Sequence, residues 1–544
     1  MTGLILALTI AAQGASPAEE FEQRLKAATG PMGLRELSAW CKDNKLKAEE
    51  KRVREVISKI ALPRKRARDW AKREAARRRA IQAREQVEKF LALRAESLDE
   101  ELGELVDWMR EKKHAPESAT GPILGMARRV LLKDPEKLSA LEEKVRSLEN
   151  EERDSSRLKS MDRQFDMRFK SIRREFTNKI AVAVDKCMKA GETGYAYDVY
   201  RWLLTVDPDN DRAHKGLGEI KVGEKWLRPF AVSQYRKGLV WDDRWGWIPR
   251  KDEMRARYDD GEAYDHATKK WGKLSELDER HSIGKDPWKI ESEHFLLIST
   301  AGLEQNVKLI TRLEAFFLQA FRQFDRFFGG KRGAALIFGM SKNTKRLKVY
   351  FYRDHEQFKT LAKPSANWVA GYYTTGTHAS YFYDLGRGTN HVMQHELTHQ
   401  ILSEFGRGGH ACAWIAEGAA TYLEDAKSKD GVLALGGIKG NRRAWSYRNR
   451  IRGGSKEHSL SDMVRLFGRG GKWDSGNISD NYRGAAATWF FLMTFDDGRY
   501  RGDTVQLLSD AYAGRPRDLN EYYGISLEGL TFLMDRFYRE CEAD

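Results

Sequence analysis

The sequence is poor in cysteine and has no long hydrophobic run. Its four cysteines in 544 residues lie far apart with no CxxC spacing: Cys41, Cys187, Cys412 and Cys541. This spacing excludes a zinc knuckle and a small scaffold held together by disulfides. The longest apolar run, residues 4–12, is shorter than the ~20 residues that a membrane-spanning helix needs. We therefore expect no transmembrane span in the mature chain.

Small residues follow the apolar run. Ala12, Gln13 and Gly14 fit the small-x-small rule for cleavage by signal peptidase. We interpret residues 1–14 as a signal peptide and expect an exported protein, periplasmic or extracellular. The residues before the run include no Lys or Arg, so a buried N-terminal helix is the alternative interpretation.

Acidic residues are the minority among the charged ones: 80 Asp and Glu stand against 95 Lys and Arg, a formal net charge of +15. Residues 51–80 carry most of the excess, and clustered cations of this kind are typical of nucleic-acid binding. Here Glu74, Glu85 and Glu88 supply partners at helical spacing, and export separates the chain from most nucleic acid. We therefore interpret the segment as the solvated face of a long helix and expect no nucleic-acid partner.

Glycine and proline are scarce between residues 21 and 190, where apolar residues recur at helical spacing. We expect a helical region over residues 15–224. Near its end, residues 193–229 combine an amphipathic helix, an Asp-Pro-Asp-Asn turn and a second short helix. This segment resembles a single tetratricopeptide-like hairpin, carried by Ala196, Tyr200, Leu204, Asp207, Pro208, Ala213, Leu217 and Gly218. One hairpin is not an array, so its expected role is to dock a protein partner.

Tryptophan and glycine are concentrated in residues 225–286, which we interpret as a connecting segment. The pieces GEKWLRP and DRWGWIP, at residues 223–229 and 243–249, are similar units typical of small hairpins. Two uses fit the tryptophans: a platform for sugar rings, or packing of the segment against its neighbours. We expect packing.

Residues 287–544 mix strand and helix patterns. A strand is expected at residues 288–300, an amphipathic helix at 305–328, a strand at 347–354, one or two strands at 371–383, and a helix from about Asn390 to Gly406. This order predicts an α+β catalytic domain with a small mixed sheet, placed after a mostly helical N-terminal region.

The last of these helices contains His395, Glu396 and His399 in the pattern HExxH. Residues four apart lie on one helix face, so both imidazoles can bind one cation, with Glu396 beside it. In zinc hydrolases with this pattern the glutamate is the general base. The alternative is a pair of packed histidines, extended by His391 into a stripe that binds no metal.

A second motif, WIAEGAATYLED at residues 414–425, supplies the context. A loop after Gly406 and a second helix would place Glu417 beside the imidazoles and complete a His2Glu site for one zinc ion. HELTH followed by WIAEG resembles the gluzincin metallopeptidases, the clan of thermolysin and aminopeptidase N. More closely, residues 288–544 resemble an uncharacterised family of exported bacterial gluzincin-like proteins, often preceded by tetratricopeptide-like helices. The resemblance implies a metallopeptidase domain over residues 287–544.

The third ligand has a competitor. His410 follows the glycine-rich turn after the HExxH helix, where neither its direction nor its rigidity is assured, and we expect Glu417 instead. A metzincin site would need a glycine and a third histidine where the chain has Leu402 and Phe405, which excludes that class.

The resemblance also bears on the groups around the ligands. Thermolysin-like proteins carry an acidic partner at the position of Thr421, so Glu424 or Asp425 would have to substitute for it. Relatives of aminopeptidase N place a tyrosine after the third ligand in a run similar to that around Tyr482, which implies a donor to the developing oxyanion. The alternatives are that Tyr482 only packs its ring, or that a neighbour such as Tyr381 is the donor.

The composition of two further segments indicates a role for each. Residues 371–384 have the character of an edge strand that pairs with an extended substrate backbone. The arginine-rich residues 439–456 are interpreted as a solvated insertion, with attraction of acidic substrates as the alternative.

Together these patterns predict zinc-dependent hydrolysis of peptide bonds in a peptide or protein substrate. Glu396 is the expected general base, with one zinc ion per chain held by His395, His399 and Glu417. Two alternatives stay open. One is a binding protein whose helical region is the working part and whose peptidase domain is degenerate. The other is a zinc hydrolase that acts on a non-peptide amide.

Overall fold

The structure is a computed structural model of the chain. It describes residues 20–21, 24, 30–60, 64–112, 119–131, 134–148, 158–254, 261–328, 346–366, 369–386, 389–406, 408–429, 432–468, 470–474 and 476–541. The predicted signal peptide, residues 1–14, lies outside the described residues. Among the helices that are described, none is long and apolar enough to cross a membrane.

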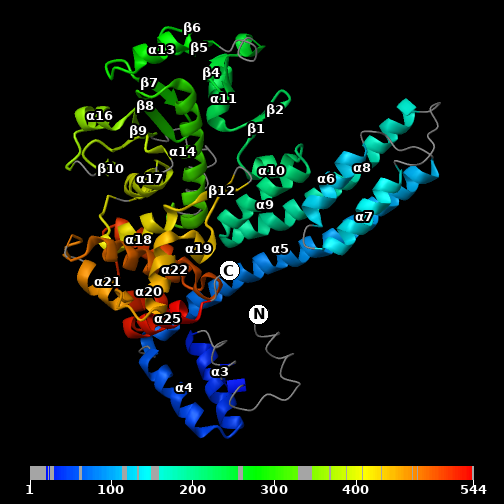
Figure 1. The fold of residues 1–544 in the computed structure, drawn as a ribbon. Coiled ribbons are helices and arrows are strands. Elements are labelled where there is room, and N and C mark those ends of the chain that lie inside the picture. The colour runs from blue at the N-terminus through cyan, green and yellow to red at the C-terminus, as the bar shows by residue number, and fades with distance from the viewer. Residues whose placement is uncertain are drawn as a thin grey trace.

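The first part of the chain is helical, as its scarcity of glycine and proline predicts. Two long helices, α5 (Arg64–Glu111) and α8 (Leu158–Ala190), lie side by side and extend away from the rest of the molecule (Figure 1). The other helices are α3 (Gly30–Asp43), α4 (Lys47–Ile60), α6 (Thr120–Val130), α7 (Pro135–Ser147), α9 (Thr193–Val206) and α10 (Asp211–Gly216). The basic residues 51–60 and 64–80 belong to α4 and α5, but most of their side chains, and with them the predicted solvated face, lie outside the described part.

The predicted pair of helices at residues 193–229 is present as α9 and α10. The side chain of Asn210 caps α10 by accepting the Ala213 N–H at 2.9 Å. In the turn between the helices, the fully buried Asp207 accepts the Thr177 hydroxyl of α8 at 3.0 Å. The turn therefore fixes the hairpin against the long helices.

Three small hairpins follow; the first two overlap the two similar units that were expected to form hairpins, and the third was not predicted. They pair β1 (Ile220–Val222) with β2 (Lys225–Leu227), β3 (Leu239–Asp242) with β4 (Gly246–Pro249), and β5 (Glu262–Asp265) with β6 (Lys270–Lys273). Short helices α11 (Pro229–Arg236), η3 (Arg250–Asp252) and α13 (Leu274–His281) lie between and after them. Trp245 is fully buried, and the rings of Trp241 and Trp247 meet edge to face at 5.3 Å, so these tryptophans pack as expected.

Asp265 is a buried polar centre of this segment, with 1% of its surface exposed. It accepts the Ala267 N–H at 2.8 Å and the Thr268 hydroxyl at 2.7 Å, and it forms an ion pair with Arg280. Burial by itself would raise the pKa of Asp265, but these donors outweigh burial and lower the pKa to about 2.

A five-stranded mixed sheet forms the centre of the second part, in the order β10-β11-β9-β8-β7. Its strands are β7 (Trp288–Glu291), β8 (Phe295–Ser299), β9 (Leu347–Tyr352), β10 (Gly371–Thr374) and β11 (Ala379–Tyr383). The pairs β8–β9 and β9–β11 are parallel, and both edge strands pair antiparallel with their neighbours. The α+β class predicted for the chain is confirmed.

The single strand expected over residues 288–300 is wrong, because the chain turns back after Glu291 and forms the hairpin β7–β8. Glu314 of α14 (Leu303–Phe324) holds this turn: it accepts the Ser292 hydroxyl at 2.5 Å and the His294 N–H at 2.7 Å. The turn contains no glycine or proline, so a partner distant in sequence stabilises it.

Helices pack on the sheet and complete the second part. α14 (Leu303–Phe324) contacts β7 and β8, and α17 (Thr389–Phe405) contacts β9, β10 and β11. The remaining elements are α16 (His355–Gln357), η4 (Phe358–Ala362), α18 (Ala413–Leu423), β12 (Lys427–Lys429), β13 (Val432–Ala434), α19 (Gly437–Gly440), α20 (Arg442–Arg452), α21 (Leu460–Phe467), α22 (Ile478–Gly498), α23 (Arg501–Tyr512), α24 (Leu519–Tyr523) and α25 (Leu527–Glu540). As Figure 1 shows, α18 and α20 to α22 lie below α17.

Candidate metal centre

Helix α17 carries the two histidines of the HExxH motif. Its residues Leu397, Ile401 and Leu402 are fully buried in the core, which fixes the helix against the sheet. His395 and His399 lie on another face, where their side chains are 12% and 18% exposed. The helical spacing of four residues therefore brings both imidazoles to one partly open place.

Helix α18 brings Glu417 to the same place. The chain leaves α17 at Gly406, and the Gly409 N–H donates to the Tyr512 carbonyl at 2.8 Å, which anchors the turn. The next residue after the glutamate, Gly418, lies against Trp489 of α22: a Cβ at this glycine would lie 1.7 Å from the indole Cδ1. Only a residue without a side chain lets α18 approach α22 this closely.

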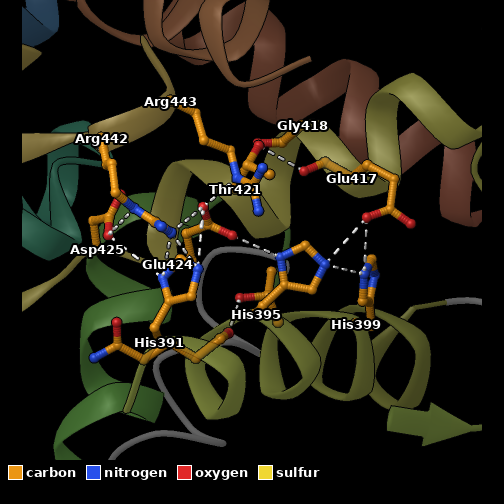
Figure 2. A network of polar contacts seen from close by, with 12 residues as sticks. His391, His395, His399, Glu417, Gly418, Thr421, Glu424, Asp425, Arg442 and Arg443 are labelled. Carbon is orange, nitrogen blue, oxygen red and sulfur yellow. Dashed lines mark hydrogen bonds and ion pairs between the residues drawn. The ribbon is translucent and has the colours of Figure 1, made fainter. Parts of the chain in front are cut away.

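The three predicted ligands meet. His395 Nε2 is 3.2 Å from Glu417 Oε2, His399 Nε2 is 3.4 Å from the same oxygen, and the two nitrogens are 3.3 Å apart (Figure 2). Zinc binds such donors at ~2.0–2.1 Å with tetrahedral geometry, which separates neighbouring donors by about 3.3–3.4 Å. The donor set and its spacing therefore fit three corners of a zinc tetrahedron.

The charges around the three ligands favour a cation. Burial would lower the pKa of His395, but hydrogen bonds with Glu417 and Glu424 raise it to about 10. Burial would likewise raise the pKa of Glu417, but His399 and His395 hold it well below its usual range. The carboxylates of Glu417 and Glu424 thus stabilise positive charge at the His395 imidazole.

Glu396 lies beside the ligands without being one of them. Burial raises the pKa of its carboxyl group, more than the two neighbouring histidines lower it. Its Oε2 accepts the backbone N–H of Tyr373 at 3.1 Å, and Tyr373 belongs to the edge strand β10. The hydroxyl of Tyr373 in turn donates to Glu404 of α17 at 2.9 Å, which ties β10 to the helix.

The other ring nitrogen of His395 has an acidic partner. Its Nδ1 is 3.0 Å from Oε2 of Glu424 (Figure 2). Glu424 is 2% exposed, and its other oxygen, Oε1, accepts the Nε–H of Arg443 at 2.6 Å. Such a partner fixes the tautomer and the orientation of a metal-binding imidazole. Of the two expected substitutes, Glu424 therefore contacts the ligand, two helical turns after Glu417. Thr421 instead donates to the Glu417 carbonyl at 2.7 Å.

His391 does not extend the metal-binding set. It lies near Asp425 and Glu424, at 3.4 Å and 3.7 Å, in a second group of potential ligand atoms. The guanidinium of Arg442 is 2.5 Å from His391 Nε2, and Arg443 is bonded to Glu424. Two guanidinium groups already neutralise these carboxylates, so this second group does not favour a metal ion.

Tyr482 of α22 also reaches the site. The centroid of its ring lies 5.8 Å from that of His395. The same ring contacts the guanidinium carbon of Arg443 at 4.9 Å and the ring of Trp473, whose centroid is 5.1 Å away. Burial, followed by the charge of Glu417, raises the pKa of Tyr482 above its usual range, so the hydroxyl keeps its proton. A protonated phenol beside the ligands can donate a hydrogen bond.

The described residues also bear on two expectations about neighbouring segments. His410 is exposed and belongs to neither group of potential ligand atoms found among them. The solvated insertion expected at residues 439–456 is only partly correct: Arg442, Arg450 and Arg452 are exposed, but α20 packs on α22, and Arg448 is 6% exposed and bonded to the Cys541 carbonyl at 2.9 Å. Arg443 was therefore missed as a contact of the site, because only the packing of α20 places it there.

Comparisons with protein-family models, curated proteins and solved structures found no match for this chain.

Proposed function

We propose that this chain is a gluzincin-like, zinc-dependent hydrolase of peptide bonds. The observation that carries the proposal is the triangle of donor atoms from His395, His399 and Glu417, whose sides of 3.2–3.4 Å fit a tetrahedral zinc ion. Bound zinc would supply a Lewis acid that lowers the pKa of water and polarises a carbonyl group. The proposal that the enzyme is exported depends on residues 1–14 alone.

Glu396 is suited to move the proton. Its raised pKa favours a carboxylate that takes a proton from water and later gives it to the leaving amine. The Tyr373 N–H, at 3.1 Å, holds the carboxylate in place, so the base is oriented before substrate binds. Tyr482 is the proposed donor to the oxyanion, because its ring lies 5.8 Å from the ring of His395 and its hydroxyl keeps its proton.

The edge strand β10 suits an extended peptide as substrate. The Tyr373 N–H points away from β11 toward Glu396, and in an antiparallel strand the carbonyl of such a residue faces the same side. An extended backbone added at this open edge would lie beside the general base. This geometry favours a peptide over a compact non-peptide amide.

The test combines metal analysis with digestion. Zinc content is measured by mass spectrometry on protein purified without chelator, and activity is measured on a peptide library. We expect about one zinc per chain in the wild type, and much less in His399→Ala. The exposed His410→Ala is the matched control and should keep its zinc. Wild-type protein without zinc, or an unchanged zinc content in His399→Ala, would contradict the proposal.

A second variant separates binding from chemistry. Glu396→Gln keeps the size of the side chain but cannot accept the proton, so it should keep zinc and lose library cleavage. Glu111→Gln, at a side chain 69% exposed on α5, is the matched control. Cleavage by Glu396→Gln at close to the wild-type rate would show that another group is the base.

A further inference from the structure

Three tyrosines stack in a row across the sheet, one from each of the strands β9, β11 and β10. The ring centroids of Tyr350 and Tyr381 are 4.9 Å apart with 4° between the planes, and those of Tyr381 and Tyr372 are 4.9 Å apart with 17° between the planes. Tyr381 is the register partner of both other residues. Neighbouring strands are spaced at ~4.7–4.9 Å, so each strand adds one ring to this tyrosine ladder.

The tyrosine ladder lies on the face of the sheet that points away from α17. Tyr373 and Ser380 are bonded to Glu404 and Gln400 of that helix, at 2.9 Å and 2.8 Å. Consecutive residues of a strand point to opposite faces, so Tyr372 and the rest of the ladder point the other way. The three tyrosines are only partly buried there.

The ladder ends with Tyr372 at an open edge, because none of the described strands pairs with the far side of β10. Besides Tyr381, one described ring contacts Tyr372: Phe358 of η4, at 6.2 Å. Phe358 also contacts Tyr352 and Tyr383, at 6.0 Å and 5.0 Å, and so it approaches Tyr372 from the side of β9 and β11. Of the described rings, none covers the face of Tyr372 toward the open edge.

A strand added at this edge would place a side chain on that uncovered face. The Tyr373 N–H points away from β11 to Glu396, so the backbone N–H and carbonyl of Tyr372 face β11. An antiparallel partner of Tyr372 at the open edge would therefore form a pair without hydrogen bonds, in which the Cα atoms approach to about 4.5 Å and the side chains are closest. Residues directly opposite each other share a face of the sheet, whatever the register of the added strand.

We propose that Tyr372 is a specificity-determining residue, which selects an extended peptide with an aromatic side chain next to the cleaved bond. This inference rests on the proposed function, because it is the general base beside Tyr373 that places the cleaved bond at this edge. The aromatic side chain adds a fourth ring to the tyrosine ladder. The Tyr372 hydroxyl donates to the Ala362 carbonyl at 2.6 Å, so the ring is oriented before the peptide binds.

The experiment is a calorimetric titration of the full chain carrying Glu396→Gln, with zinc added, so that the peptide is not cleaved. The amide oxygen of the variant can still accept the Tyr373 N–H. The probes are acetylated, amidated hexapeptides that differ only in a central phenylalanine, cyclohexylalanine or leucine. Cyclohexylalanine has the bulk of phenylalanine without its aromatic face. We expect the phenylalanine peptide to bind about threefold to tenfold more tightly than the other two. Equal binding of phenylalanine and cyclohexylalanine, or saturable binding of no probe, overturns the proposal.

Substitutions in the same background locate the preference. Tyr372→Leu removes the aromatic face and should abolish the difference between the phenylalanine and cyclohexylalanine peptides. Tyr372→Phe loses only the bond to Ala362 and should keep the difference. Tyr350→Leu makes the same change at the far end of the ladder, two strands away, and is the matched control. Circular dichroism checks that each variant folds. A preference that survives in folded Tyr372→Leu overturns the proposal.

Digestion of the peptide library by the wild type separates this proposal from the proposed function. Cleavage with no preference for an aromatic residue at a fixed position overturns the role of Tyr372 and leaves peptide hydrolysis standing. A Tyr372-dependent binding preference in a chain that cleaves no peptide contradicts the hydrolysis and supports the selection of an aromatic side chain. A dimer that Tyr372→Leu separates in sedimentation would place a second copy of the chain at this edge and overturn the proposal.

Discussion

Replacing Glu424 by glutamine tests how the zinc ligand His395 is held. The buried carboxylate serves two donors: Oε2 is 3.0 Å from His395 Nδ1, and Oε1 accepts the Arg443 Nε at 2.6 Å. Glutamine keeps the size but has one acceptor oxygen. If the amide oxygen faces His395, the amide N–H groups face the guanidinium of Arg443. If the amide is flipped, its oxygen faces Arg443 and its N–H groups face the imidazole N–H of His395. Either way one buried donor loses its partner.

The expected loss can be worked from this geometry. Removing the carboxylate that orients a metal-binding histidine typically costs about 10–100-fold in metal affinity. That range equals about 1.4–2.8 kcal/mol. It agrees with the loss of one hydrogen bond to a charged group, about 1.5–3 kcal/mol. We therefore expect the zinc dissociation constant of Glu424→Gln to rise about 10–100-fold.

The assay is an equilibrium competition for zinc with a chromogenic chelator, with circular dichroism as the check on folding. Asp425→Asn is the matched control: it makes the same change on the next residue, whose carboxylate faces His391 and Arg442 instead of His395. We expect this control to bind zinc within about threefold of the wild type. Unchanged affinity in Glu424→Gln, or equal losses in the two variants, would refute the reasoning.

Three further changes have defined outcomes. Tyr482→Phe should keep its zinc and lower peptide turnover about a hundredfold, because only the proposed oxyanion donor is removed; kinetics near wild type would leave the ring a packing role. Gly418→Ala would drive a methyl group into Trp489 and should cost about 1–3 kcal/mol in urea unfolding, while an unchanged midpoint would contradict the close approach. Asp265→Asn should lower the free energy of unfolding by about 2 kcal/mol at pH 7, because the folded protein lowers the pKa of Asp265 to about 2 and so stabilises the fold at any pH above the pKa of an unfolded aspartate. The difference from wild type should vanish as the pH falls from about 4 to 2, and a difference independent of pH would exclude this cause.

Local patterns were sufficient to predict the elements that carry the proposed ligands. The apolar period predicted the helix observed as α14, and Asn390 as N-cap together with Gly406 as stop predicted the extent of α17. The position of Glu417 beside the histidines could be predicted because a loop after Gly406 and a second helix suffice to return the chain to the HExxH helix. These inferences needed only short-range geometry.

Contacts that depend on distant packing were not predicted. Arg443 lies in an arginine-rich segment with no local signal for burial, and only the position of α20 against α22 turns it toward Glu424. The β7–β8 turn was hidden because Ser292 and His294 continue an alternating pattern, while the group that stabilises the turn, Glu314, lies on α14. In both cases a side chain from another element, and not the local sequence, decides the structure.

The long helices have a consequence for the order in which the chain folds. α25 (Leu527–Glu540) packs on α4 (Lys47–Ile60), and α24 packs on α5, so the last helices complete a surface presented by the earliest described ones (Figure 1). A ribosome that adds ~5–20 residues per second separates the synthesis of the two by tens of seconds. During that interval the face of α4 that will meet α25 is uncovered. The contact between α4 and α25 can therefore form only after nearly the whole chain has been synthesised.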